Sequence, residues 1–366
     1  MFGFPAQVIA FTVVGCGLWL MVLVWAYRQR YESNQWHHCI ALIIATGFWW
    51  LGEALAIRLG KYEYAPFPSW ITLPGGSASA AQPDFLYKAV ALLMKSTSGT
   101  VLGSSTCLNK WFVPFPIVAL EAALVFTILR LSVLRFKGRG WRPAVATAGF
   151  SGLLIINLTM VADPVVSKTA ECAPMPNPHT VLDFGLWRWI TLPEFPGYWF
   201  GVPLINYAAW LTACFVFGLY MRWHDERAGG VDRRERTLLS FVAVVIVSII
   251  AMIGLLLAIY TPLGRVLQGG EARQFSGLIA LIVLASAGIF LGRRHHDPEL
   301  KLFFWAPQLV VLAFCLFLLL LEPNGKIFGL WTLSTAILAV VMAWPYLVKA
   351  ADRPKRADVQ DVGIRG

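Results

Sequence analysis

Two apolar helices joined by an aromatic, polar segment are encoded between residues 161 and 210, and this stretch decides the fold. It reads Val-Ala-Asp-Pro at 161–164, Trp-Arg-Trp at 187–189 and Tyr-Trp-Phe-Gly-Val-Pro-Leu-Ile-Asn-Tyr-Ala-Ala-Trp at 198–210. Because proline removes a backbone donor, Pro164 predicts that the first helix closes at Asp163. Gly201-Val-Pro203 predicts the start of the next helix, with Asn206 one turn inside it.

The composition of the whole chain is typical of a membrane protein. Of the 366 residues, 58% are hydrophobic and only 14% are charged, whereas soluble domains carry about 25% charged residues. Apolar runs long enough to cross a hydrocarbon core of roughly 30 Å recur along the sequence. We therefore expect an all-α fold, a polytopic transmembrane helical bundle. The net charge of +10 could suggest nucleic acid, but excess Lys and Arg in a membrane protein sets orientation, so no nucleic-acid partner is expected.

The apolar runs predict about nine transmembrane helices. They lie at Phe4–Tyr27, Cys39–Leu59, Phe112–Leu134, Pro143–Ala162, Phe200–Met221, Leu238–Tyr260, Phe275–Leu291, Leu302–Leu321 and Ile327–Val348. Residues 1–348 would form one transmembrane domain with long loops at 60–111 and 163–200, and residues 349–366 a basic tail. Within the first loop, Phe85–Trp111 fits an amphipathic or re-entrant segment better than a span.

Basic residues predict the orientation of these helices. Most of the 30 Lys and Arg fall in short segments on one side, which the positive-inside rule assigns to the cytoplasm. The N-terminus and both long loops would then lie outside and the C-terminus inside, in a bacterial cytoplasmic membrane. Cys107 and Cys172 fall in the outer loops and could pair in an oxidising compartment or remain thiols.

The predicted topology places five polar residues near the outer ends of four helices. Asp163, Glu53, Asn157 and Asn206 would lie within roughly 10 Å of one membrane interface, and Glu121 a little deeper. Because such groups rarely face lipid, we expect them to line one cavity that opens outward. The alternative is a set of hydrogen bonds between helices that only hold the bundle together.

Aromatic residues flank these polar positions in the sequence. Trp and Tyr gather at membrane interfaces whatever the function, but an aromatic face can also stabilise a nearby cation. The candidates for a substrate pocket are Tyr62, Tyr64, Trp187, Trp189, Tyr198 and Trp210.

Patterns for metal and nucleotide sites are missing from the sequence. The six His are scattered, and the pairs His37-His38 and His295-His296 fall on the predicted cytoplasmic side. No Cys and His spacing suggests zinc, and no glycine-rich fingerprint follows a strand. We expect neither a metal nor a cofactor.

A carboxyl group in an apolar, aromatic pocket can act as a general acid, because burial disfavours its charged form. The natural substrate inside a membrane is an apolar polyene. Protonation of a terminal isoprenoid double bond gives a tertiary cation, which water captures in hydration and an internal alkene captures in cyclisation. A transporter or channel with a polar path, or a non-catalytic pigment-binding scaffold, would also account for the pattern.

At these residues the chain resembles the membrane carotenoid-biosynthesis family that includes the carotenoid 1,2-hydratases of the γ-carotene and bisanhydrobacterioruberin type. The resemblance covers roughly residues 45–70 and 145–215. It rests on Gly52-Glu53, Gly60, Tyr62, Tyr64, Asp163-Pro164, Trp187-x-Trp189, Tyr198, Gly201-x-Pro203, Asn206 and Trp210. Ala209 stands where the family pattern has Gly, and the last three helices carry no matching motif.

The resemblance implies a cofactor-independent hydro-lyase that adds water to the C1–C2 double bond of an acyclic carotenoid end group. It implies that Asp163 or Glu53 donates the proton while the other orients the water or balances the cation, with Asn206 and Asn157 placing the water. The end-group pocket would be lined by Trp187, Trp189, Tyr62 and Tyr64. The expected partners are an apolar carotenoid or isoprenoid substrate, membrane lipid and other membrane enzymes of the carotenoid pathway.

Overall fold

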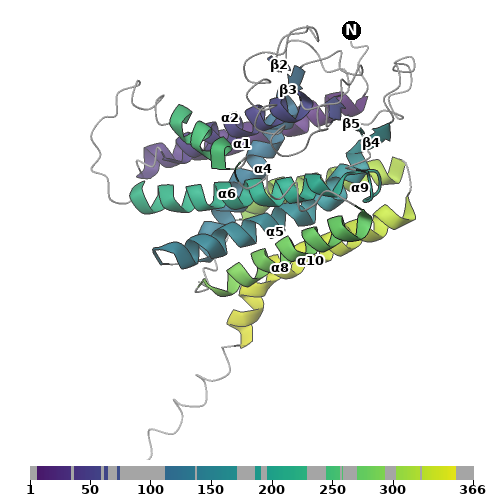
Figure 1. The fold of residues 1–366 in the computed structure, drawn as a ribbon. Helices are drawn as coiled ribbons and strands as arrows, with labels where there is room; N and C mark the ends of the chain where they lie inside the picture. The colour runs from purple at the N-terminus through teal and green to yellow at the C-terminus, as the bar shows by residue number, and fades with distance from the viewer. Residues whose placement is uncertain are drawn as a thin grey trace, which may run out of the picture.

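The chain folds as the predicted all-α polytopic bundle (Figure 1). The structure, a computed structural model, describes residues 6–33, 37–58, 62–64, 72–74, 112–136, 138–170, 186–190, 196–228, 245–255, 258, 270–292, 302–321 and 324–351. The helices are α1 (Ala6–Ser33), α2 (His37–Arg58), α4 (Phe115–Arg135), α5 (Trp141–Val166), α6 (Leu204–Ala228), α8 (Glu271–Phe290), α9 (Leu302–Leu321) and α10 (Gly325–Ala351). Residues 245–255 are also helical.

Seven helices in the described part of the chain are long and apolar enough to cross a membrane. These candidate spans are Ile9–Gln29, Phe115–Arg135, Trp141–Val166, Leu204–Trp223, Glu271–Phe290, Phe303–Leu321 and Gly325–Ala343. Two further apolar helices, His38–Ala54 and Val245–Leu255, are described over shorter lengths. Their length and composition identify an integral membrane protein.

Helix α5 lies at the centre of the bundle. It packs on α4, α6, α8, α9 and α10, while α1 and α2 pack on α4 (Figure 1). Small residues allow α5 to approach α8 and α6 closely. A Cβ on Gly149 would lie 2.4 Å from the Ala285 carbonyl oxygen of α8, and a Cβ on Gly218 of α6 would lie 2.8 Å from the Ala148 Cα. Lipid is as apolar as a leucine side chain, so tight packing at small residues is what holds membrane helices together.

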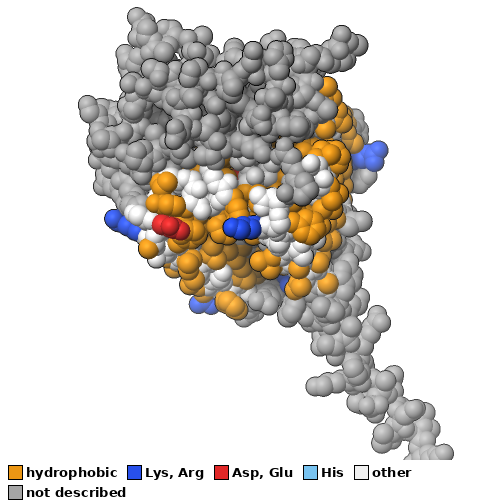
Figure 2. Space-filling view, turned by 90° about the vertical axis from the view of Figure 1, so that its right-hand side faces the viewer, with side chains coloured by type: hydrophobic (Ala, Val, Ile, Leu, Met, Phe, Trp, Pro, Cys, Tyr) orange, Lys and Arg blue, Asp and Glu red, His pale blue; other side chains and the backbone are white. Residues whose placement is uncertain are grey.

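Two small sheets, which the sequence did not predict, lie at one end of the bundle. One has the order β1 (Tyr62–Tyr64), β5 (Trp187–Ile190), β4 (Ser167–Ala170), and the other pairs β2 (Thr72–Pro74) with β3 (Phe112–Pro114). We call this the strand end. Figure 2 views the molecule from this end: the described side chains there are mainly hydrophobic, with few charged ones among them.

The strands show at which end of the bundle the chain leaves α2 and enters α4. Strand β1 follows α2, β3 precedes α4, and the two strands contact each other. Because both flanks of residues 65–111 lie at the strand end, the later helices keep the predicted alternation. Phe85–Trp111 itself lies outside the described residues, as do Cys107 and Cys172. Which side of the membrane the strand end faces remains a prediction.

Several predicted helix boundaries are wrong, three of them at the strand end. Helix α4 begins at Phe115, because residues 112–114 are extended and pair with β2. Helix α6 begins at Leu204 rather than Phe200, because Phe200 and Gly201 have φ values of 50° and 91°. Helix α5 does not close at Asp163 but continues through Pro164 to Val166.

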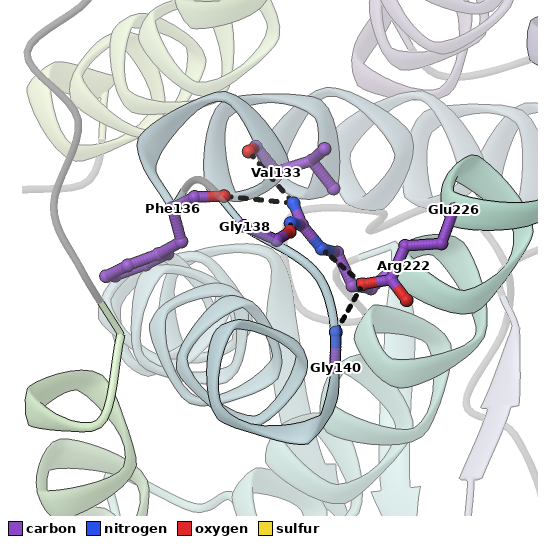
Figure 3. Close-up of polar contacts among 6 residues, drawn as sticks. All are labelled: Val133, Phe136, Gly138, Gly140, Arg222 and Glu226. Atoms are coloured by element: carbon purple, nitrogen blue, oxygen red, sulfur yellow. Dashed lines mark hydrogen bonds and ion pairs between the residues drawn. The ribbon is translucent and has the colours of Figure 1, made fainter. Parts of the chain in front are cut away.

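The opposite end of the bundle is fastened by Arg222 of α6 (Figure 3). Its guanidinium donates to the carbonyl oxygens of Phe136, at 2.9 Å, and of Gly138, and its Nε lies 3.2 Å from the Glu226 carboxylate. Glu226 in turn accepts the Gly140 backbone N–H at 3.2 Å. The α4–α5 turn needs glycine at 138 and 140, because Gly138 and Gly140 have positive φ values of 106° and 97°, which other residues rarely adopt. Arg222 thereby ties this turn to α6.

Candidate active site

A cavity lies inside the bundle next to the strand end, between α1, α4, α5, α6, α9 and β5. The space between the protein atoms there amounts to about 650 Å³, which includes the part that is open to the surroundings. The polar groups that line it come from Glu121, Thr159, Asp163 and Cys315. The apolar lining is Phe11, Val14, Ile117, Leu120, Leu124, Ile155, Leu158, Ala162, Val166, Trp187, Trp210, Val311 and Phe314. No Lys or Arg among the residues that the structure describes lines this cavity.

Asp163 is held in place in the last turn of α5. Its side chain is only 4% exposed, and its Oδ2 accepts a hydrogen bond of 2.5 Å from Asn206 Nδ2 of α6. Its backbone oxygen accepts both the N–H and the Oγ–H of Ser167, the first residue of β4. Asn206 occupies one carboxyl oxygen and leaves Oδ1 for other partners.

Pro164 continues the helix because another residue replaces the donor that it lacks. In an unbroken helix the N–H of residue 164 would bond to the carbonyl of Met160. Instead, Trp199 donates its indole Nε1–H to the Met160 oxygen at 3.1 Å. The last turn of α5, with Asp163 in it, therefore keeps its hydrogen bonding complete through a residue from a different segment.

Trp199 is itself fixed by a tight turn. Trp199 and Val202 form a bridge with N–O distances of 3.2 and 2.9 Å around Phe200-Gly201. Both central residues have positive φ, as a type I′ turn requires. Gly197 is needed as well, since a Cβ there would lie 2.3 Å from the Gly201 carbonyl oxygen.

Three carboxyl groups from three helices interact with one another, and two of them, Glu121 and Asp163, belong to residues that line this cavity. Glu121 of α4 lines it, and its Oε2 is enclosed without a hydrogen-bond partner among the described residues. Glu53 of α2, 9% exposed, interacts electrostatically with both Glu121 and Asp163. Three negative charges in an apolar enclosure would repel one another and lose their hydration. The arrangement favours a state in which the cluster retains protons.

Two tryptophans present aromatic surface to the cavity. Trp187 of β5 and Trp210 of α6 both line it. Trp210 stacks on Trp49 of α2, with ring centroids 4.6 Å apart and planes 30° from parallel. This stack fixes the ring of Trp210 beside the carboxyl groups.

The sheet at the strand end joins two of the predicted segments. Tyr62 pairs with Trp189, and Tyr64 with Trp187, across the antiparallel strands β1 and β5. Strand β5 also runs parallel to β4, whose first residue follows the end of α5. Trp189 is buried at 5% exposure. The backbones of all four predicted aromatic positions therefore lie within one sheet.

Five predicted site residues with described side chains do not line the cavity: Glu53, Asn157, Trp189, Tyr198 and Asn206. Asn157 lies on α5, but its Nδ2 donates to the Ser334 carbonyl of α10 at 3.2 Å, and its own carbonyl accepts the Ser334 hydroxyl at 2.8 Å. For Asn157 the structure thus shows a hydrogen bond between helices. Tyr198 is partly buried and packs against the hydrophobic core, but does not line the cavity.

Several residues at the site were not among those predicted. Phe11 of α1 and Phe314 and Cys315 of α9 line the cavity, but in the sequence they look like any other apolar helical positions. The Tyr207 hydroxyl is enclosed without a hydrogen-bond partner in the described part of the chain and interacts electrostatically with Asp163. Only the role of Trp199 had an indication in the sequence: a proline inside a helix leaves one carbonyl without its backbone N–H donor, so another donor is needed.

Within the described ranges, no group of three or more His, Cys, Asp or Glu side chains has a geometry that could hold a metal ion.

Comparison with known proteins gives one match. Residues 112–270 match the family described as carotenoid biosynthesis protein. This range includes Glu121, Asp163, Asn206 and the two tryptophans that line the cavity. No curated protein and no solved structure matches the chain.

Proposed function

We propose that this integral membrane protein, whose residues 112–270 match the carotenoid biosynthesis protein family, is a carotenoid hydratase. It would add water to the C1–C2 double bond of an acyclic carotenoid end group. The reaction needs a proton donor, an apolar enclosure for the end group and a second group that handles water.

The observation that carries the proposal is the pair of carboxyl residues that line one largely apolar cavity. Asp163 and Glu121 line it together, on neighbouring helices, and the described lining holds no cation that would keep both charged. A carboxyl group in such surroundings can hold a proton until a weak base such as an alkene arrives. The tryptophan rings supply a surface that stabilises a carbocation.

In the proposed reaction Asp163 donates its proton to C2 of the end group. The electron pair of the double bond forms the new C–H bond, which leaves a tertiary cation at C1 beside Trp187 and Trp210. Oδ1 is the donor atom that we assign, since Oδ2 accepts from Asn206.

Water then attacks the cation, and its surplus proton must leave. Glu121 is suited to orient the water and accept that proton, because its Oε2 lies at the cavity without a hydrogen-bond partner in the described part of the protein. Glu53 acts as the neighbouring carboxyl group whose charge affects proton binding by Asp163 and Glu121. The product is the tertiary alcohol, and return of the proton to Asp163 closes the cycle with one water consumed.

The test is to express the full chain in cells that accumulate an acyclic-ended carotenoid and to analyse the pigments by mass spectrometry. We expect a product heavier by one water. Asp163→Asn and Glu121→Gln should each lower its formation by about 100-fold or more, the range typical of general acid–base groups. Glu271→Gln, which removes an exposed carboxyl group on α8, should not.

The alternatives give different results in the same experiment. A transporter or a pigment-binding scaffold would yield no hydrated product from any acyclic-ended carotenoid. Full activity in both carboxyl variants would contradict the assignment of the acid and of its partner even if hydration occurs.

A further inference from the structure

The part of the cavity wall that α1 and α9 form contains two aromatic rings, Phe11 and Phe314, beside Val14, Val311 and Cys315. The main packing partners of α1 are α2 and α4, and those of α9 are α4, α5 and α10. Where α1 and α9 approach each other, Phe11 meets Phe314 edge to face at a centroid distance of 5.9 Å. At the opposite end of the bundle Trp25 stacks on Phe303 at 5.6 Å. We call this junction the α1–α9 seam.

Phe11 and Phe314 lie at the cavity on two helices that also have exposed apolar positions. Both rings line the cavity, and Phe11 is only 3% exposed. The outer faces of the same two helices are open: Val13 on α1 is 67% exposed and Phe317, one turn along α9, is 52% exposed. In a bilayer these exposed faces would contact lipid tails, and the two phenyl rings line the same cavity as Asp163.

Moving these rings costs little. An edge-to-face pair contributes about 0.5–1.5 kcal/mol beyond its buried area, and a phenyl side chain has no hydrogen bond to break. By contrast, the paired strands and the Trp199 turn at the strand end are joined by backbone hydrogen bonds, which would break if these segments moved apart.

We propose that a linear polyene enters the cavity laterally from the lipid, through the α1–α9 seam, with Phe11 and Phe314 as the gate. The reacting end group then lies beside Asp163 while the rest of the polyene extends along the seam into the bilayer. This rests on the proposed function, because it concerns how the same substrate reaches the same carboxyl groups.

A photo-crosslinking experiment tests the path without relying on catalysis. The photoreactive residue p-benzoylphenylalanine replaces Phe317 of α9 or, as the control, Phe328 of α10. Both are exposed phenylalanines, 52% and 43%, about one turn from the connection between their helices. Full-length protein in membranes that contain an acyclic-ended carotenoid should form a carotenoid adduct several-fold more at position 317. Equal adducts, or more at 328, would overturn the path.

A second measurement uses the gate itself. Phe314→Trp narrows the seam, and overpacking of this kind costs about 1–3 kcal/mol. We expect turnover of a full-length carotenoid to fall about tenfold further than turnover of a short isoprenoid with the same end group. The short chain does not have to extend through the seam while its end group reacts. An equal loss for both substrates would overturn the gate.

The two proposals can fail separately. An adduct at position 317 without any hydrated product would leave the path standing and contradict hydration. A hydrated product with adducts favouring position 328 would support hydration and exclude this path.

Discussion

Two asparagines on neighbouring helices illustrate how the same residue type takes different roles. Asn206 donates to the Asp163 carboxyl group, whereas Asn157 bonds to Ser334 on α10. A hydrogen bond to an ionisable group contributes about 1.5–3 kcal/mol. The first bond sets the geometry of the proposed acid, and the second joins two helices.

Replacement of Asn206 should therefore impair catalysis. We expect Asn206→Leu to lower the initial rate of hydration by about 10- to 100-fold, because each 1.4 kcal/mol lost corresponds to a tenfold change. The measurement is product formation in membranes with matched protein levels.

Asn157→Ala is the matched control for Asn206→Leu. It should lower the thermal unfolding midpoint in detergent and leave the rate of the folded protein unchanged, since it removes a bond between α5 and α10. A loss of rate at Asn157 with none at Asn206 would contradict these roles.

At the scale of elements, the last turn of α5 depends on a donor from outside the helix. Trp199→Phe should leave the Met160 carbonyl without its partner, at a cost of about 1–3 kcal/mol, and shift Asp163. Pro164→Ala restores a backbone N–H that can bond to that same carbonyl. We therefore expect Trp199→Phe to impair activity and stability much less in a Pro164→Ala background than in the wild-type chain.

A double-mutant cycle measures this coupling through hydration rates and thermal unfolding of the four proteins. Strictly additive effects would show that Trp199 acts elsewhere than through the gap left by Pro164.

The contact between Arg222 and the α4–α5 turn can be tested at the end of the bundle opposite the strand end. Arg222→Gln removes the donors to the carbonyls of Phe136 and Gly138 and the partner of Glu226. The free energy of unfolding should fall by about 1–3 kcal/mol, while the folded enzyme keeps its activity. Lys326→Gln, at an exposed site on α10, should change neither. Unchanged thermal unfolding of the Arg222 variant would contradict this role.

At the scale of the whole molecule, the alternation of helices predicts on which side of the membrane each end of the bundle lies. A reporter that is active only outside the cytoplasm should be active when fused after Ala170, at the strand end, and inactive at the C-terminus. The same activity at both positions would contradict the alternation, and the reverse result would contradict the orientation inferred from basic residues.

Much of the bundle, and the depth of its polar groups, could be predicted from the sequence. The fixed rise of 1.5 Å per residue predicts Asp163 and Asn206 near one depth and Glu121 a little deeper, and the structure brings them together. Trp187 and Trp210 meet them at the cavity.

The rotation of each helix about its axis could not be predicted in the same way. Asn157 lies at a suitable depth but faces α10, and Phe314 faces the cavity from a helix with no motif. In lipid an apolar side chain can point in either direction at little cost, so the pattern of residues does not fix which face turns inward. Strands β1 to β5 were missed because three or four residues that pair with distant segments leave little local signal.

The central claim is that an enzyme carboxyl group gives its proton to the carbon–carbon double bond. The most direct test is hydration of an acyclic-ended carotenoid by the purified protein in D₂O, with the position of the label read by NMR. The proposed mechanism predicts one deuterium bonded to C2 of each hydrated end group, which stays there when the product is returned to ordinary water. A hydrated product without deuterium at C2 would contradict proton transfer to the alkene.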